Sequence, residues 1–168
     1  MHSRRSSRWS RWLVASVVVA GCGPAAPRSP TTPVASAPTG YDPALAERLG
    51  ADDYGMAKYV VAFLRAGPNR DQSAEEGERL MTAHLANIRR MAEAGTLVVA
   101  GPFLDDGPLR GIYIFRVDTI DEARALTATD PAIQAGRLEM ELHPWYGSAA
   151  LREVTALHLR VQRKSFGE

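Results

Sequence analysis

The pattern of hydrophobic and polar positions between Met56 and Gly147 predicts four strands and two helices. Runs rich in β-branched and aromatic residues indicate strands, and hydrophobic positions that recur every three to four residues indicate amphipathic helices. The order is strand, helix, strand, strand, helix, strand, which predicts a ferredoxin-like α+β fold with both helices on one face of a four-stranded antiparallel sheet. The expected strands cover residues 56–67, 96–101, 111–117 and 137–143, and the expected helices cover residues 73–95 and 119–129.

The first helix has clear end signals. Ser73 is a plausible N-cap with Glu76 three residues later, which is the spacing of a capping box, and Gly95 stands where a C-terminal cap is expected. Its hydrophobic stripe should face the sheet, and His84 lies within that stripe. The expected inward positions are Leu80, Met81, His84, Leu85, Ile88, Met91 and Ala92.

The two central strands predict a covered second sheet face. The blocks YVVAFL and IYIF are apolar at consecutive positions, whereas a strand with one solvated face should alternate between apolar and polar residues. The simplest cover is a second copy of the same sheet, so we expect a two-fold homodimer, a dimeric α+β barrel.

The segment HPWYG, residues 143–147, follows the last expected strand. Pro144 should end the strand because proline lacks a backbone donor, and Gly147 should let the chain turn. Trp145 and Tyr146 are expected to pack either across the dimer seam or over a pocket. The remaining residues, 148–168, fit either a strand or a helix capped by Ser148, and the cap favours a helical C-terminal extension with Ala150, Val154, Leu157 and Val161 on one side.

The N-terminus predicts export. Residues 1–21 combine four arginines with a nine-residue apolar run, Trp12–Ala20, which is too short to span a bilayer and is typical of a secretory signal peptide. The run ends in VAGC, which resembles the lipobox of bacterial lipoproteins, so we expect lipidation of Cys22 and anchoring to the cell envelope. Gly23 follows in place of the inner-membrane retention residue, which favours the outer membrane in a cell with two membranes. Residues 22–53, rich in proline up to residue 38, are expected to form a tether.

Composition excludes several classes of function. Without the four N-terminal arginines the formal net charge of +1 becomes −3, so the exported domain has no electrostatic reason to bind nucleic acid. Cys22 is the only cysteine, and its lipidation would leave no thiol for a disulfide or for catalysis. His143 and His158 show no ligand spacing to His84, so no metal or other cofactor is expected.

Several short motifs occur in the order and spacing of a known family. They are HLANIRRMAEAG, AGPF, GIYIF, DPAIQAG and HPWYG. The chain therefore resembles the YCII-related (YciI-like) family of small dimeric α+β barrel proteins over residues 54–147. The resemblance implies a catalytic His–Asp pair, here His84 and Asp130, and some relatives act on lactone-type ring compounds.

The residues themselves leave two readings of this pair open. A half-buried imidazole needs a hydrogen-bond partner, and an aspartate that orients it would make a general acid–base unit. Alternatively, Asp130 caps the turn before Pro131, and His84 is a core histidine with a satisfied hydrogen bond. The two readings imply two different functions. A catalytic pair implies an enzyme of elimination, isomerisation or lactone-type chemistry, and a structural pair implies a non-catalytic ligand-binding or partner-assisting module.

Three further residues are candidates for substrate contacts. Arg65 ends the first strand, Pro102 follows the second, and Trp145 belongs to HPWYG. Each also has a structural reading: Arg65, together with Glu139 and Glu141, can pair with charges of a second subunit, Pro102 can turn the chain, and Trp145 can close the dimer seam.

Overall fold

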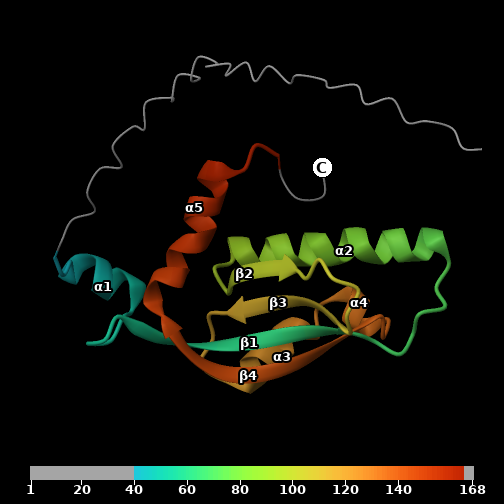
Figure 1. Ribbon diagram of the computed structural model, residues 1–168, viewed down its shortest axis with the longest axis horizontal. Coiled ribbons are helices and arrows are strands. Elements are labelled where there is room, and N and C mark those ends of the chain that lie inside the picture. The colour runs from blue at the N-terminus through green and yellow to red at the C-terminus, as the bar shows by residue number, and fades with distance from the viewer. Residues whose placement is uncertain (1–39, 165–168) are drawn as a thin grey trace, which may run out of the picture. The chain divides into compact units, whose positions relative to one another are not determined.

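The computed structural model describes residues 40–164 of the 168-residue chain, which form a four-stranded antiparallel sheet packed against helices (Figure 1). The strand order β2-β3-β1-β4 places β1 and β3 at the centre, so the predicted ferredoxin-like α+β fold is confirmed. The elements are α1 (Pro43–Leu49), β1 (Met56–Ala66), α2 (Ala74–Glu93), β2 (Leu97–Pro102), β3 (Leu109–Phe115), α3 (Ile120–Thr127), α4 (Pro131–Gln134), β4 (Leu138–Ser148), the 3-10 helix η1 (Ala149–Glu153) and α5 (Val154–Val161).

The N-terminal expectations lie outside the described residues. The expected signal peptide, Cys22 and the start of the expected tether all precede Gly40, where the compact unit of the described chain begins. Helix α1 falls within the stretch 22–53 that the sequence assigns to the tether. Asp42 caps this helix by accepting a hydrogen bond from the backbone N–H of Leu45 at 3.0 Å.

Helices α2 and α3 both begin at side-chain caps. Ser73 accepts a hydrogen bond from the backbone N–H of Glu76 at 3.2 Å, as predicted, but the Glu76 carboxylate pairs with Arg79 and does not complete a capping box. The complete box occurs at α3, where Thr119 and Glu122 each bond the other's backbone N–H.

The main core lies between the sheet and helices α2, α3 and α4. Its buried members come from all four strands and from all three helices, so one contiguous core holds the two layers together. Met81 is an exception to the predicted inward stripe of α2, because 49% of it is exposed. The buried residues are Val60, Ala62, Leu64, Met91, Leu97, Tyr113, Phe115, Ala123, Ala132 and Leu138.

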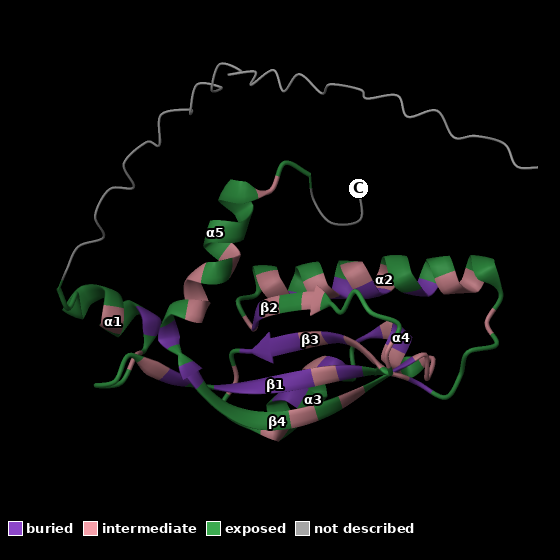
Figure 2. Cartoon of the chain, viewed as in Figure 1, coloured by how far each residue is buried: buried purple, intermediate pink, exposed green. Residues whose placement is uncertain are grey.

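The second face of the sheet is partly covered by the chain itself. Leu49 of α1 and Ala149 of η1 pack against Tyr59, Val61 and neighbouring apolar residues near the start of β1. A second copy was expected to cover this face, and α1 and η1 of the same chain already cover one end of it. Figure 2 shows the central strands β1 and β3 as mostly buried and α5 as mostly exposed.

Strand β4 is longer than predicted, because Pro144 does not end it. The ladder with β1 continues past the Val60–Pro144 pair as far as Met56 and Ser148. Strand β4 is an edge strand, and an edge position tolerates proline when the missing N–H would face away from the sheet. The turn expected at HPWYG is therefore wrong, and the chain leaves the sheet only at η1.

Trp145 and Tyr146 lie on opposite faces of the sheet, because successive strand residues alternate. Trp145 pairs with Tyr59 on the second face, with ring centroids 5.8 Å apart, while the Tyr146 hydroxyl donates to the Asp52 carboxylate. Gly147 has a different role from the expected turn: a Cβ atom at this position would clash with the Trp145 ring.

The predicted helical C-terminal extension is confirmed for residues 149–161. Ser148 caps η1 by accepting a hydrogen bond from the backbone N–H of Ala150, and α5 follows directly. None of the residues of α5 is buried. Among the described residues, no helix has both the length and the apolar character needed to cross a membrane.

Candidate functional site

The structure brings His84 and Asp130 together in the main core layer. His84 lies on the sheet-facing side of α2, and Asp130 is the N-cap of α4, immediately before Pro131. His84 Nδ1 and Asp130 Oδ2 are 2.7 Å apart, and the two residues are 6% and 0% exposed. Asp130 Oδ1 also accepts a hydrogen bond from the backbone N–H of Ala132 at 2.9 Å. The aspartate therefore caps the helix, as one alternative from the sequence has it, and also binds the histidine, as the other alternative has it.

Asp130 determines which ring nitrogen of His84 carries a proton. A carboxylate only accepts hydrogen bonds, so the Nδ1–H of His84 donates to it. Nε2 of the neutral ring is then an acceptor. This tautomer presents a basic nitrogen on the side of the ring that faces away from Asp130.

Tyr113 of β3 occupies that other side of the ring. Its hydroxyl lies 3.3 Å from His84 Nε2, and the two rings are stacked with centroids 6.2 Å apart. Burial, and secondarily the negative charge of Asp130, raise the pKa of Tyr113 far above its usual range. Tyr113 therefore keeps its proton, and its hydroxyl donates a hydrogen bond to Nε2. The result is a buried hydrogen-bonded chain from tyrosine through histidine to aspartate.

A second polar cluster lies one turn further along α2. Asn87 is buried, and its Oδ1 accepts hydrogen bonds from Arg90 Nη2 at 2.7 Å and from Thr129 Oγ1 at 3.1 Å. Its Nδ2 is buried and has no hydrogen-bond partner within the described part of the chain. Because Thr129 precedes Asp130, this cluster ties α2 to the segment that carries the aspartate.

Sequence reasoning did not single out Tyr113 or Asn87. The signal for Tyr113 was its place in GIYIF, because a buried tyrosine on the helix-covered face needs a partner for its hydroxyl. Asn87 lies three residues after His84 and therefore on the same side of α2.

The three other predicted contact residues do not gather around the pair. Arg65 and Trp145 lie on the second face of the sheet, opposite His84, because they share that face with Tyr59. Pro102 lies at the exposed end of β2. Within one subunit, a substrate at His84 would not reach Arg65 or Trp145.

The second face carries another histidine–carboxylate pair. His143 Nε2 lies 3.0 Å from Glu141 Oε1, and both side chains are about half exposed, at 49% and 47%. Glu141 also binds Arg65 at 2.9 Å, so it pairs with charges of its own chain. These hydrogen bonds, first from His143 and then from Arg65, lower the pKa of Glu141. Within residues 40–164, no group of three histidine, cysteine, aspartate or glutamate side chains could hold a metal ion.

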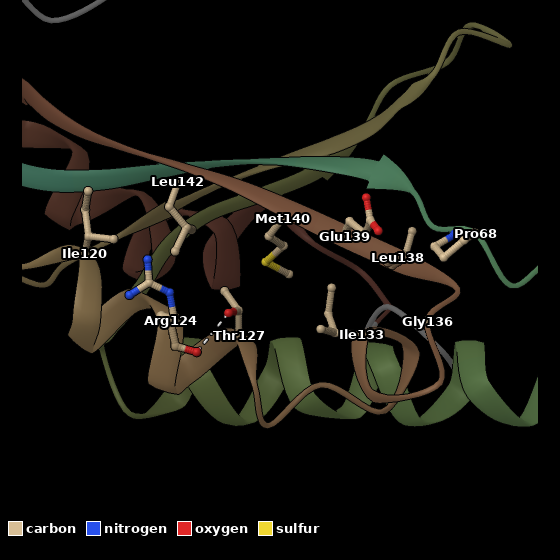
Figure 3. A pocket seen from close by; sticks show the side chains of 10 residues that line it. All are labelled: Pro68, Ile120, Arg124, Thr127, Ile133, Gly136, Leu138, Glu139, Met140 and Leu142. Carbon is tan, nitrogen blue, oxygen red and sulfur yellow. Dashed lines mark hydrogen bonds between the residues drawn. The ribbon is translucent and has the colours of Figure 1, made fainter.

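An open groove of about 540 Å³ lies between α3, α4 and β4 (Figure 3). Met140 and Leu142 of β4 line it because the eight-residue α3 leaves them only partly buried. Arg124 and Thr127 of α3 supply polar groups, and the Glu139 carboxylate points away from the groove (Figure 3). His84 and Asp130 do not line this groove.

Comparison with known proteins identifies the family. The profile of the YCII-related domain matches residues 61–146, just over half of the chain. The chain belongs to the YCII-related family. The matched residues of this YCII-related domain include His84, Tyr113 and Asp130, and they end before η1 and α5.

Other comparisons add little to the YCII-related domain. No curated protein matches the chain. Among solved structures, it is similar to 5-chloro-2-hydroxyhydroquinone dehydrochlorinase from Burkholderia phenoliruptrix AC1100, determined in complex with 2,5-dihydroxybenzoquinone. The two are 21% identical, the match covers 52% of this chain and 92% of that chain, and the TM-score is 0.41.

Proposed function

We propose that this protein is an enzyme that uses the His84–Asp130 pair for general acid–base chemistry on a small organic molecule. The observation that carries the proposal is the buried 2.7 Å hydrogen bond between these residues, with the Tyr113 hydroxyl on the other ring nitrogen. In a site with little water, a carboxylate orients the imidazole and stabilises its protonated form. Membership of the YCII-related family agrees with an enzyme of this kind.

The proposed chemistry is proton transfer at His84 Nε2. This nitrogen takes a proton from an acidic C–H group of the ligand, Asp130 stabilises the resulting imidazolium, and the proton returns to another atom of the ligand or to a leaving group. That sequence describes an isomerisation, an elimination or a lactone-type reaction. Because His84 is only 6% exposed and Tyr113 occupies Nε2, the ligand must either displace the Tyr113 hydroxyl or transfer its proton to that hydroxyl while the hydroxyl proton passes to Nε2.

Deuterium exchange tests the proposal without knowledge of the natural substrate. The protein is incubated in D₂O with a panel of ring lactones and hydroxylated aromatic compounds, and NMR follows deuterium incorporation at carbon. We expect exchange with at least one compound. The rate of exchange should fall at least about a hundredfold in His84→Gln and Asp130→Asn, as general acid–base catalysis implies.

His143→Gln is the matched control, because it removes the histidine of an exposed histidine–carboxylate pair. It should leave the exchange unchanged. If folded His84→Gln exchanges deuterium as fast as the unmodified protein, the enzyme proposal is wrong.

The open groove supports a second candidate function, a non-catalytic module that binds an apolar ligand. The groove is lined by partly buried apolar side chains, and its polar groups sit on α3 (Figure 3). A dansyl-labelled fatty acid serves as the probe, since its carboxylate can meet Arg124. Leu142→Trp should fill the groove and abolish the fluorescence increase, while Leu126→Trp, at another partly buried position that does not line the groove, should retain it. Binding that survives Leu142→Trp would exclude the groove.

We also propose that the protein is a lipoprotein of the bacterial cell envelope, anchored through Cys22. The support is the signal-like N-terminus that ends in VAGC, and Gly23 after the cysteine favours the outer membrane. Mass spectrometry of membrane-extracted protein should find a chain that begins at an acylated Cys22. An unmodified cysteine, or a chain that begins elsewhere, would contradict this proposal.

Finally, we propose that the protein is a homodimer that pairs through the part of the second sheet face left open by α1 and η1. Phe63, Trp145 and Phe103 are only partly covered in the single chain, and the last two are each 40% exposed. Large apolar side chains that stay partly exposed are typical of an interface. A monomer at micromolar concentration in sedimentation experiments would contradict the dimer.

A further inference from the structure

Helix α5 exposes apolar side chains that its own chain does not cover. Leu157 is 52% exposed and Val161 is 77% exposed, and Figure 2 shows most of the helix as exposed. An isolated helix of eight residues is marginally stable in water, and most helices gain their stability by packing an apolar side. Helix α5 contacts β2 and η1 of its own chain, but its apolar side chains remain exposed and available to a partner surface.

The apolar side of α5 continues the open sheet face. Val154, Leu157 and Val161 are spaced three and four residues apart, so they form one stripe along the helix. Leu151 precedes Val154 by three residues and packs against the apolar cluster of the second sheet face. We call Leu151, Val154, Leu157 and Val161 the α5 stripe; its first residue, Leu151 of η1, packs against that face.

Charge differs between α5 and the far end of the open sheet face. Helix α5 and the residues after it carry Arg160, Arg163 and Lys164, with no acidic residue between Val154 and Lys164. The far end of the sheet face, where β2 ends and β4 begins, carries Glu139 and the neighbouring loop residues Asp105 and Asp106, all exposed.

The far end of the face is acidic after its ion pairs are counted. Arg65 and Glu141 neutralise each other there. Arg110 lies next to the loop and Arg70 bonds the Arg137 carbonyl at the start of β4, so these two cations leave one of the three remaining carboxylates unbalanced. The Arg137 guanidinium lies on the helix-covered side, near Gly77 of α2. The basic residues of α5 and the acidic residues of the far end therefore lie at opposite ends of one sheet face.

These charges favour one of the two possible orientations of the two-fold axis in a face-to-face dimer. A two-fold axis along the strands would bring both α5 helices to the same end, where their cationic groups would repel one another. A two-fold axis across the strands instead brings α5 of each copy over the acidic end of the other. Only the second arrangement is electrostatically complementary.

We infer that α5 is a dimerisation arm, whose stripe and basic end cover the acidic end of the open sheet face of a second copy. This inference rests on the proposed dimer, and it adds to it the role of a segment that lies outside the matched YCII-related domain.

Two leucines of α5 give a matched test. Leu157 belongs to the stripe, whereas Leu159, which is 63% exposed, lies two residues away on the other side of the helix. Sedimentation velocity on the full-length chain in a mild nonionic detergent measures the dimer dissociation constant for Leu157→Ser and Leu159→Ser. We expect at least about a tenfold increase for Leu157→Ser and less than about a twofold change for Leu159→Ser, in line with the loss of one buried leucine. Arg160→Glu should also weaken the dimer, and more so at low salt.

Each outcome decides a different point. If the chain dimerises but Leu157→Ser does not weaken it more than Leu159→Ser, the arm is wrong and the proposed dimer stands. If the unmodified chain is monomeric, both are wrong. If Leu157→Ser leaves the dimer unchanged but, in a Cys22→Ser background without the proposed lipid anchor, reduces flotation with phosphatidylglycerol vesicles, α5 binds an anionic lipid surface, and the inference is overturned.

Discussion

Substitution of Asp130 should separate its role as a cap from its role as the partner of His84. Asp130→Ala removes the 2.9 Å bond to the backbone of Ala132 and the 2.7 Å bond to His84. Loss of a helix cap costs about 1 kcal/mol of stability. A buried donor left without a partner costs about 1–3 kcal/mol, and His84, at 6% exposed, has little access to water. The expected loss in free energy of unfolding is therefore about 2–4 kcal/mol.

Asp130→Asn should cost only about 1 kcal/mol, because its side chain can still cap α4 and still bond the histidine. The amide oxygen accepts from Ala132, and the amide nitrogen donates to His84 Nδ1. This geometry requires the other tautomer of His84, with the proton on Nε2. The base that faces away from residue 130 is then lost, although the fold is retained.

Two measurements check this reasoning. Urea unfolding followed by far-ultraviolet circular dichroism gives the stabilities, and Asp42→Ala, which removes a cap with no histidine attached, is the control at about 1 kcal/mol. Long-range ¹⁵N–¹H NMR correlations of the His84 ring report the tautomer. If Asp130→Ala costs no more than Asp42→Ala, or if the ring in Asp130→Asn keeps its proton on Nδ1, Asp130 does not have the double role of helix cap and His84 partner.

Three further predictions concern single side chains. Because the pKa of Tyr113 is raised above its ordinary value of 10.0, its contribution to stability is present below about pH 10 and declines as the pH rises further. Tyr113→Phe should lessen that alkaline decline in the free energy of unfolding, measured by urea unfolding. An unchanged dependence of the free energy of unfolding on pH would contradict this. Gly147→Ala should destabilise the protein by about 1–3 kcal/mol, because its Cβ would clash with the ring of Trp145. Gly101→Ala is the control: its Cβ meets no atom within 4 Å, so the same assay should show no clash penalty. The Tyr146 hydroxyl is the main cause of the lowered pKa of Asp52, so Tyr146→Phe should raise that pKa in an NMR carboxyl titration, and a constant value would exclude this hydrogen bond.

Local patterns predicted the core fold well where one periodicity dominated. The strand blocks and the Ser73 cap appear in the structure because propensity, capping and burial agree at those positions. The prediction was wrong at Pro144, where a local rule about proline depends on whether the strand is at an edge. That information is a property of the whole sheet, which no short stretch contains.

The candidate site was predictable only in part, because some of its contacts depend on tertiary structure. The inward stripe located His84 on the sheet side of α2, and the resemblance to the YCII-related family supplied Asp130. Tyr113 completes the hydrogen-bonded chain only because β3 lies beneath α2, and that is a tertiary fact. The cover of the second face by Leu49 and Leu151 was missed for the same reason, since both segments lie outside the predicted βαββαβ pattern.

The two histidine–carboxylate pairs show why environment, and not residue type, decides the proposed chemistry. His143 and Glu141 are about half exposed, so water competes for both groups and the pair contributes little. His84 and Asp130 interact where water is nearly absent, so their hydrogen bond fixes one tautomer and directs Nε2 towards Tyr113. The burial that favours the proposed chemistry also blocks a ligand, so the proposed catalysis requires Tyr113 to move or to relay the proton. A Tyr113→Phe variant that still exchanges deuterium would favour movement, and loss of exchange with the His84 tautomer unchanged would favour the relay.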